Sequence, residues 1–246
     1  NPVTLTVTDL SGNVSTCSAT VTVQDNVNPN AICQNLTVQL DATGNVTINS
    51  TQIDNGSSDA CGIASMTLNN DSFNCSNIGP NTVIMTVTDV NGNVSTCTST
   101  VTVEEDMPPT ALCQNITVQL DGAGNLTVAA IDVDNGSFDN CSSGGALTYS
   151  LAPNTFDCDD VGLVTATLTV TDAAGNSSTC TASITVEDNV APTAICQDIT
   201  IQLNAAGNAS IAPAQIDNGS SDNCGIANMS VNPNTFTCAA VGANPV

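Results

Sequence analysis

Residues 83–104 read VIMTVTDVNGNVSTCTSTVTVE. Residues 83–87 and 94–103 are rich in β-branched side chains, and the Asn91-Gly92 pair between them is typical of a tight hairpin turn. The stretch therefore predicts two antiparallel strands. This hairpin belongs to a repeated unit, because similar segments occur twice more in the chain. They are VTLTVTDLSGN from Val3 and TVTDAAGNSSTCTASITVED in residues 169–188.

An internal repeat organises the whole chain. Cys33, Cys113 and Cys196 are spaced by 80 and 83 residues, and the cysteines at positions 61, 141 and 224 keep the same spacing. The predicted segments are the C-terminal part of a repeat (1–27), two complete repeats (28–106 and 107–188) and the N-terminal part of another (189–246). The chain ends fall at equivalent points of the repeat, so we expect a segment of a longer, nearly periodic chain.

Within a complete repeat the pattern predicts short strands and turns. Residues 36–40 alternate between apolar and polar side chains, as a half-buried strand does, and residues 41–45 read as a turn. Further strands are predicted near 46–48, 63–68 and 73–75. About seven strands in a unit of this size favour an all-β, immunoglobulin-like sandwich, with a closed barrel as the second choice. Because no window shows a helical period, we expect almost no helix.

Charge and cysteine content limit the possible functions. The 246 residues include 23 Asp and Glu but no Lys, Arg or His, which gives a net charge of −23. Binding to nucleic acid or to anionic membranes requires basic residues, so neither partner is expected. No apolar run is long enough to span a membrane, and no leader peptide is expected in this segment. The 12 cysteines favour a disulfide framework, and hence an extracellular or cell-surface location.

Four cysteines per repeat permit three connectivities. We expect one bond to link the opening and closing strands and a second to close a short local loop. The predicted pairs are Cys33–Cys97, Cys61–Cys75, Cys113–Cys180, Cys141–Cys158 and Cys224–Cys238. Cys17 and Cys196 are left over, and their partners are expected in the missing halves of their repeats. A redox or zinc site is disfavoured because the chain has neither a CxxC motif nor a histidine.

Oxygen-bearing side chains gather in three loops of each repeat: the acidic linker, the DNGSxD loop and the TDxxGN hairpin turn. Strand order should bring these loops to one pole of a sandwich. Carboxylate and amide oxygens without nitrogen or thiolate ligands suit Ca²⁺, so a structural calcium site is predicted at each junction. Asx turns in solvated loops are the alternative explanation. The candidate ligands are Asp25, Asp54, Asn55, Asp59, Asp89, Asn93, Glu104, Asp106, Asp132, Asp134, Asp139, Asp172, Asn176, Asp188, Asp217 and Asp222.

Four sequence motifs, taken together, resemble the hyalin-type, immunoglobulin-like repeats of giant Bacteroidota cell-surface adhesins. They are PTALCQNITVQLDGAGN (109–125, with its counterpart at 192–208), IDNGSSDNCGI (216–226), NTFTC (234–238) and residues 169–188. That resemblance implies an extracellular adhesin, with gliding-motility adhesins exported by type IX secretion among the relatives. The linker DNVAP (188–192) also resembles the acidic calcium linker of cadherins, whereas EEDMP (104–108) departs from it.

Three classes of function can be compared. A structural role, as a calcium-stiffened rod or filament on the cell exterior, would involve neighbouring repeats and other copies of the chain as partners. A repeat that binds a carbohydrate or protein receptor by avidity is the alternative, but only Tyr149 and Phe138 are aromatic residues outside the shared pattern. An enzyme is disfavoured because His and Lys are absent, and the adjacent pair Asp159 and Asp160 reads as a solvated turn.

Overall fold

The computed structural model describes residues 1–142 and 147–242. Contacts divide the chain into two compact units, Asn1–Met107 and Pro108–Val246. Both are built from short strands, which confirms the all-β, sandwich-like, disulfide-stapled fold expected from the sequence. Helices in the described part of the chain are single turns of three or four residues, and none is a candidate membrane span.

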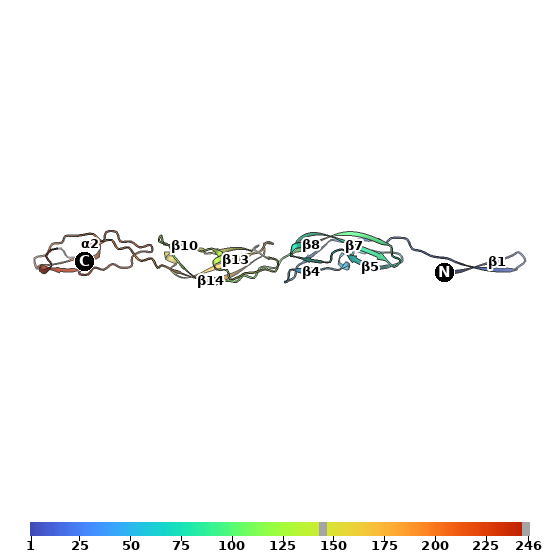
Figure 1. The fold of residues 1–246 in the computed structure, drawn as a ribbon, viewed down its shortest axis with the longest axis horizontal. Helices are drawn as coiled ribbons and strands as arrows, with labels where there is room; N and C mark the ends of the chain where they lie inside the picture. The colour runs from blue at the N-terminus through green and yellow to red at the C-terminus, as the bar shows by residue number, and fades with distance from the viewer. Residues whose placement is uncertain (143–146, 243–246) are drawn as a thin grey trace. The chain divides into compact units, whose positions relative to one another are not determined.

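The first complete repeat contains a four-stranded and a two-stranded sheet (Figure 1). The larger sheet has the order β3-β8-β7-β5, in which β3 and β8 are parallel and the other neighbours are antiparallel; the smaller pairs β4 with β6. Its elements are β3 (Leu36–Gln39), β4 (Asn45–Thr47), α1 (Ser50–Ile53), β5 (Ile63–Leu68), β6 (Ser72–Asn74), η1 (Cys75–Asn77), β7 (Gly79–Asp89) and β8 (Val94–Glu104). These described strands number six, where the sequence favoured about seven.

The hairpin of β7 and β8 supplies most of the core of this repeat. Val83, Met85 and Val87 alternate along β7 with more exposed residues, and all three are fully buried. Phe73 of β6 is buried as well, so an aromatic ring from the small sheet contributes to the same apolar interior. The predicted hairpin is therefore correct in kind, but both strands run to 11 residues because the pairing continues past the apolar run.

The second complete repeat has the same topology. Its larger sheet has the order β11-β13-β14-β9, and β10 pairs with β12. The core includes Leu168, Val170, Ile184 and Phe156, at positions equivalent to those used in the first repeat. Its elements are β9 (Ile116–Gln119), β10 (Asn125–Thr127), η2 (Ala130–Asp132), β11 (Thr148–Ala152), β12 (Thr155–Asp157), η3 (Cys158–Asp160), β13 (Gly162–Thr171) and β14 (Ser177–Glu187).

Two further segments are partial repeats. The hairpin of β1 (Pro2–Thr8) and β2 (Val14–Thr20) forms a two-stranded sheet of its own, and Figure 1 shows it, in dark blue, with no third strand beside it. The described residues after 188 contain β15 (Asn208–Ser210) paired with β16 (Thr235–Thr237), together with α2 (Pro213–Ile216) and η4 (Cys238–Ala240). These correspond to the small sheet and single helical turns of a complete repeat.

Candidate metal sites and the disulfide pattern

The TDxxGN turn is a preformed cage of hydrogen bonds around a buried carboxylate. Asp89 Oδ1 accepts the backbone N–H groups of Asn91 and Asn93, both at 2.8 Å, and Oδ2 accepts the Asn93 amide at 2.7 Å. Burial raises the pKa of Asp89, but the bonds from Asn93 and the backbone outweigh it and leave the pKa below its usual value. Asp172 and Asn176 form the equivalent turn in the second repeat. In the first repeat, the turn therefore favours the ionised form of Asp89.

At this pole of the first repeat, the three predicted loops meet. Asp25 of the linker accepts a hydrogen bond from the Asn91 amide at 2.8 Å, while its backbone oxygen accepts one from Asn93 at 3.2 Å. Ligand atoms of Asp25, Asp59 and Cys61 lie within 4.8 Å of one another. The pKa of Asp25 is lowered by the N–H of Val27 and then by the Cys61 thiol and Asn91. The linker, the DNGSxD loop and the hairpin turn therefore share one small region.

Each linker contributes one acidic residue in the same local geometry. Asp25 Oδ1 accepts the N–H of Val27 at 3.0 Å, and Asp188 Oδ1 accepts the N–H of Val190 at 3.1 Å. Glu105 occupies the equivalent position and accepts the N–H of Met107 at 2.7 Å. The sequence analysis had instead proposed Glu104 and Asp106 as ligands in this linker. Alignment of the repeats on their first cysteine would have identified Glu105, because it stands at the same distance before that cysteine as Asp25 and Asp188 do.

The second unit contains a related group of side chains between consecutive repeats. Asn223, in the loop after DNGSxD, donates to Asp188 Oδ1 at 3.1 Å and to the backbone oxygen of Asp121 at 3.2 Å. Its own Oδ1 and the neighbouring Asp222 Oδ2 are buried without a hydrogen-bond partner, as is Asp139 Oδ1 at the equivalent loop position of the preceding repeat. Buried, unpartnered acceptor oxygens are costly unless a donor or a cation satisfies them.

Other predicted ligands serve the loops themselves. Asp54 Oδ1 accepts the N–H of Ser57 at 2.9 Å, and Asp217 does the same for Ser220 at 3.0 Å. Asp134 bonds Ser137 in the same way, and the backbone N–H of Asn55 reaches Ile32 O at 2.9 Å. Glu104 accepts from Gln39, Asp132 accepts the N–H of Ala129, and Asp106 is exposed. The structure does not place these residues with the Asp25 and Asp59 group.

The grouped residues fit a hard divalent cation. A thiol is a poor ligand for Ca²⁺, so Asp25 and Asp59 would be the ligands in the first repeat, with Asp188, Asp222 and Asn223 at the later junction. The chain has no basic side chain to neutralise these carboxylates. The unpartnered oxygens of Asp222 and Asn223 are the structural observation that fits an ion from solution.

Acid sensitivity of the turns can be tested without any metal. Asp41 closes the turn after β3, and the Thr43 hydroxyl followed by the N–H groups of Asn45 and Thr43 lower its pKa. A carboxyl whose folded pKa lies below the unfolded value stabilises the fold above the unfolded value, and this contribution is lost as the pH falls through the folded pKa. The sequence also contains a natural reference, since Asn204 makes the same turn bonds to Ala206 and Asn208.

We therefore expect Asp41→Asn to keep the fold at neutral pH and to make the first repeat less sensitive to acid. The measurement is the urea midpoint in chelator as the pH falls from about 5 to about 2, since carboxylates titrate in this range. The midpoint of the wild-type chain should fall more steeply than that of the variant. Parallel curves for the two proteins would show that this turn carries no proton linkage.

The disulfides agree with the predicted long pairs and overturn the predicted short ones. Cys33–Cys97 and Cys113–Cys180 are both present, with Cα–Cα distances of 5.7 and 5.8 Å. Cys158, however, is bonded to Cys224, with a Cα–Cα distance of 5.2 Å. The expected Cys141–Cys158 and Cys224–Cys238 pairs are thus wrong. Cys61–Cys75 is wrong as well, because Cys61 is a free thiol while Cys75 is disulfide-bonded.

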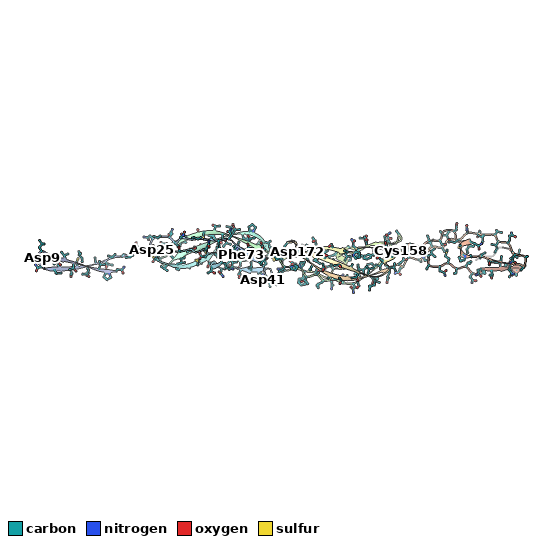
Figure 2. All side chains as sticks on the ribbon, turned by 180° about the vertical axis from the view of Figure 1, so that it is seen from behind. Asp9, Asp25, Asp41, Phe73, Cys158 and Asp172 are labelled. Carbon is teal, nitrogen blue, oxygen red and sulfur yellow. A yellow bond between two sulfur atoms is a disulfide. The ribbon has the colours of Figure 1, made fainter. Side chains whose placement is uncertain are left out.

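Strand length explains why the short pairs cannot form. Cys61 lies near Asp25 and the hairpin turn, whereas Cys75 Sγ is 3.6 Å from Gly44 O, beside the turn at the other end of β8. Figure 2 labels Asp25 and Asp41 at opposite ends of this repeat. Eleven residues of β8 extend over roughly 30 Å, whereas a disulfide requires Cα atoms about 4.4–6.8 Å apart. Closeness in sequence was therefore misleading.

The Cys158–Cys224 bond joins two consecutive repeats. Cys158 Sγ lies 3.4 Å from Asn223 O and 3.8 Å from Gly124 O, so it is enclosed by the turn of its own repeat and the loop of the next. Gly124 has φ of +75°, and a Cβ there would come within 2.6 Å of this sulfur. The glycine of this turn therefore leaves room for the disulfide. Neither Cys75 nor Cys141 is a free thiol, since each is disulfide-bonded.

Comparisons with known proteins return likenesses of structure alone. No protein-family model matches the chain, and no curated protein matches it. Human protocadherin-24 EC1-2 is 12% identical at a TM-score of 0.38, covering 67% of this chain and 100% of that one. Mouse PcdhgC3 EC1-3 is 14% identical at a TM-score of 0.33, and the match covers 76% of this chain and 77% of that one. Against Protocadherin Gamma B7 domains 1-4 the identity is 13%, the TM-score 0.35 and the coverage 79% of this chain and 59% of that one.

Proposed function

We propose that this chain is a structural segment of an extracellular adhesin or surface filament, in which consecutive repeats are fastened by disulfides and by calcium. The observation that carries the proposal is the Cys158–Cys224 bond, because it ties one repeat to the next across their linker. A bond inside a repeat stabilises that repeat alone. A bond between repeats limits bending at the junction and keeps the repeats joined when the chain is pulled.

Calcium would act at the same junction. Asn223 already connects Asp188 of the linker with the turn at Asp121, and the unpartnered oxygens of Asp222 and Asn223 would complete a set of oxygen ligands. An ion there would neutralise carboxylates that have no basic partner in the chain, and it would hold linker and loop together. Neighbouring repeats are therefore the first partners of each repeat. The same reasoning extends the proposal to Asp25 and Asp59 in the first repeat.

Receptor binding by avidity is the alternative, and the two unmatched aromatic residues give it little support. Tyr149 is half-buried and packs against the core of the second repeat, so its ring serves the fold. Phe138 is exposed, but its backbone pairs with Thr110 in an isolated bridge. Among the described residues of the same repeat, no second exposed ring accompanies it. A carbohydrate site normally needs a wider stacking surface. An unidentified surface or glycan receptor would therefore be bound elsewhere in a longer protein.

Thermal unfolding of the oxidised chain, with calcium and with chelator, tests the proposal. A ligand bound only to the folded state adds about 2.7 kcal/mol at a concentration 100-fold above its Kd, so calcium should raise the melting temperature by several degrees. Asp59→Asn and Asp222→Asn should each reduce this rise and remove one site from a calorimetric calcium titration. Both substitutions preserve side-chain size and leave an oxygen to accept the loop N–H.

Asp159→Asn is the matched control, because Asp159 is an exposed carboxylate on η3 that belongs to none of the proposed sites. It should leave the calcium response unchanged. If all three variants respond to calcium as the wild-type chain does, the loop carboxylates are turn residues only. If calcium leaves the melting temperature of the wild-type chain itself unchanged, the repeats are joined by disulfides without metal.

A further inference from the structure

The disulfides provide a covalent route along the chain that is much shorter than the backbone. Cys33 is bonded to Cys97, so this bond bypasses the 64 residue steps between them. Cys113 is bonded to Cys180 in the same way, across 67 residue steps. Only 16 residue steps of backbone separate Cys97 from Cys113. The route from Cys33 to Cys180 therefore consists of two disulfides and one short connection.

The bond between repeats continues this route. Cys180 lies 22 residue steps after Cys158, and Cys158 is bonded to Cys224 in the following repeat. The connections of 16 and 22 steps together join Cys33 to Cys224 through 38 residue steps, where the backbone alone takes 191. Any further disulfide can shorten this route but cannot lengthen it.

The two connections consist largely of strands that are already extended in the folded protein. The first contains residues 98–104 of β8, which pair with β7, and four of them also pair with β3. The second contains β13 and the start of β14. A strand rises about 3.2–3.4 Å per residue, and a fully stretched chain spans at most about 3.3–3.6 Å per residue. The strands on the route therefore have little length to gain, and the remaining slack lies in the linker and in the hairpin turn.

We propose that the disulfides make this segment a strain limiter, in which tension passes along the covalent route and unfolding of the sheets releases little length. In the first repeat, the strands β3 to β7 lie between Cys33 and Cys97 and are off the route. Stretched out, the bypassed loop would measure roughly 200 Å. The inference rests on the proposed structural role, which it deepens by naming how load is carried, but it does not require calcium.

A strain limiter separates extensibility from thermodynamic stability. The stability of each repeat depends on its apolar core, whereas its extension under load depends on covalent bonds that survive the loss of packing and hydrogen bonds. Repeats of this size have small cores, and aromatic residues are only 2% of the chain. Such a chain can stay short under tension even when the core of a repeat gives way.

The test is to stretch single molecules of the whole chain by handles at its two ends, either oxidised or held in excess dithiol reductant. Each disulfide takes up two electrons and two protons from the dithiol, which itself becomes a disulfide. About 150 bypassed residues at 3.3–3.6 Å each should make the final contour length of the reduced chain roughly 500 Å greater. This length does not depend on whether the reduced chain folds.

Removal of the bond between repeats should lengthen the oxidised chain by a defined amount. In the variant with both Cys158→Ala and Cys224→Ala, the load at Cys180 takes the 44 residue steps of backbone to position 224 instead of the 22 steps back to position 158. The final contour length should increase by roughly 70 Å. Cys61→Ala is the control, because it removes a free thiol that is not on the route, and it should leave the length unchanged.

Phe73→Ala tests whether the core carries load. Phe73 is buried in the first repeat, within the bypassed loop. In the oxidised chain, the variant should show no release step of roughly 200 Å, as in the wild-type chain. In the reduced chain, it should lower the force at which the first repeat releases its length.

Three results would overturn the inference: an oxidised chain as long as the reduced one, release steps of roughly 200 Å in the oxidised Phe73→Ala variant, or an unchanged length when Cys158 and Cys224 are replaced. Non-reducing peptide mapping of the same sample shows whether the Cys158–Cys224 bond is formed. If it is formed and the oxidised chain still extends fully, the strain limit fails, while the structural role and its calcium test stand. If it is absent, the strain limit and the fastening of consecutive repeats by disulfide both fail.

Discussion

Removal of the Cys33–Cys97 disulfide by paired alanine substitution is expected to lower the unfolding free energy of the first complete repeat by about 4 kcal/mol. The bond closes a loop with a sequence separation of 64 residues, and chain entropy assigns roughly this amount to a loop of that length. Folded domains of this size commonly have only about 5–15 kcal/mol in total. Oxidative refolding, followed by chemical denaturation monitored by hydrogen exchange in β7 and β8, measures the change.

Cys61→Ala is the control for this substitution. Cys61 is an exposed free thiol, so its replacement should change the same exchange rates little. Local exchange is a better readout than one melting curve, because a chain of several repeats does not unfold in a single two-state step. Equal protection of β7 and β8 with and without the disulfide would show that the sandwich core alone stabilises the repeat.

Phe73→Ala is expected to destabilise the first repeat by about 3–5 kcal/mol, the usual cost of truncating a buried aromatic side chain. Phe73 is 2% exposed, and the chain has few large side chains with which a cavity could be refilled, since aromatic residues are 2% of its composition. The cores depend instead on Val, Ile, Leu and Met. We expect faster exchange throughout β7 and β8, with the Cys33–Cys97 bond still formed.

Phe138→Ala provides a matched aromatic control, because Phe138 is 59% exposed in the second repeat. Its truncation should cost well under 1 kcal/mol, as most surface substitutions do. Phe156→Ala, at the position equivalent to Phe73, should in turn destabilise the second repeat alone. A similar effect of Phe73→Ala and Phe138→Ala would show that the buried position of Phe73 does not govern stability.

The disulfides stabilise the chain at two levels, within a repeat and between repeats. Bonds from the opening to the closing strand hold each sandwich, whereas Cys158–Cys224 holds successive sandwiches together. The proposed calcium at the linkers would add a reversible interaction to these covalent ones. The two effects can be separated experimentally, since one responds to chelators and the other to reductants.

Much of the fold could be predicted from local pattern. The Asn91-Gly92 turn and the β-branched runs around it indicated the central hairpin, and the repeated cysteine positions showed that the unit recurs. The Cys33–Cys97 pair followed from the positions of the first and last strands. The candidate site was less predictable. Several candidate carboxylates, such as Asp54 and Asp217, close their own loops, and composition does not distinguish these from residues that face a shared site.

The sequence by itself determined the class of fold, the repeat and the local turns, because each depends on side-chain period, turn residues and spacing along one segment. Only the tertiary structure decided the pairing of the cysteines for which the sequence had predicted short local bonds. Strands of 11 residues separate Cys61 from Cys75 by the length of a sandwich, while they bring Cys158 against the loop of the following repeat. The same geometry decided that Asp25, Asp59 and the hairpin turn share one pole. Contacts between distant segments depend on where strands end in space, and no local pattern contains that information.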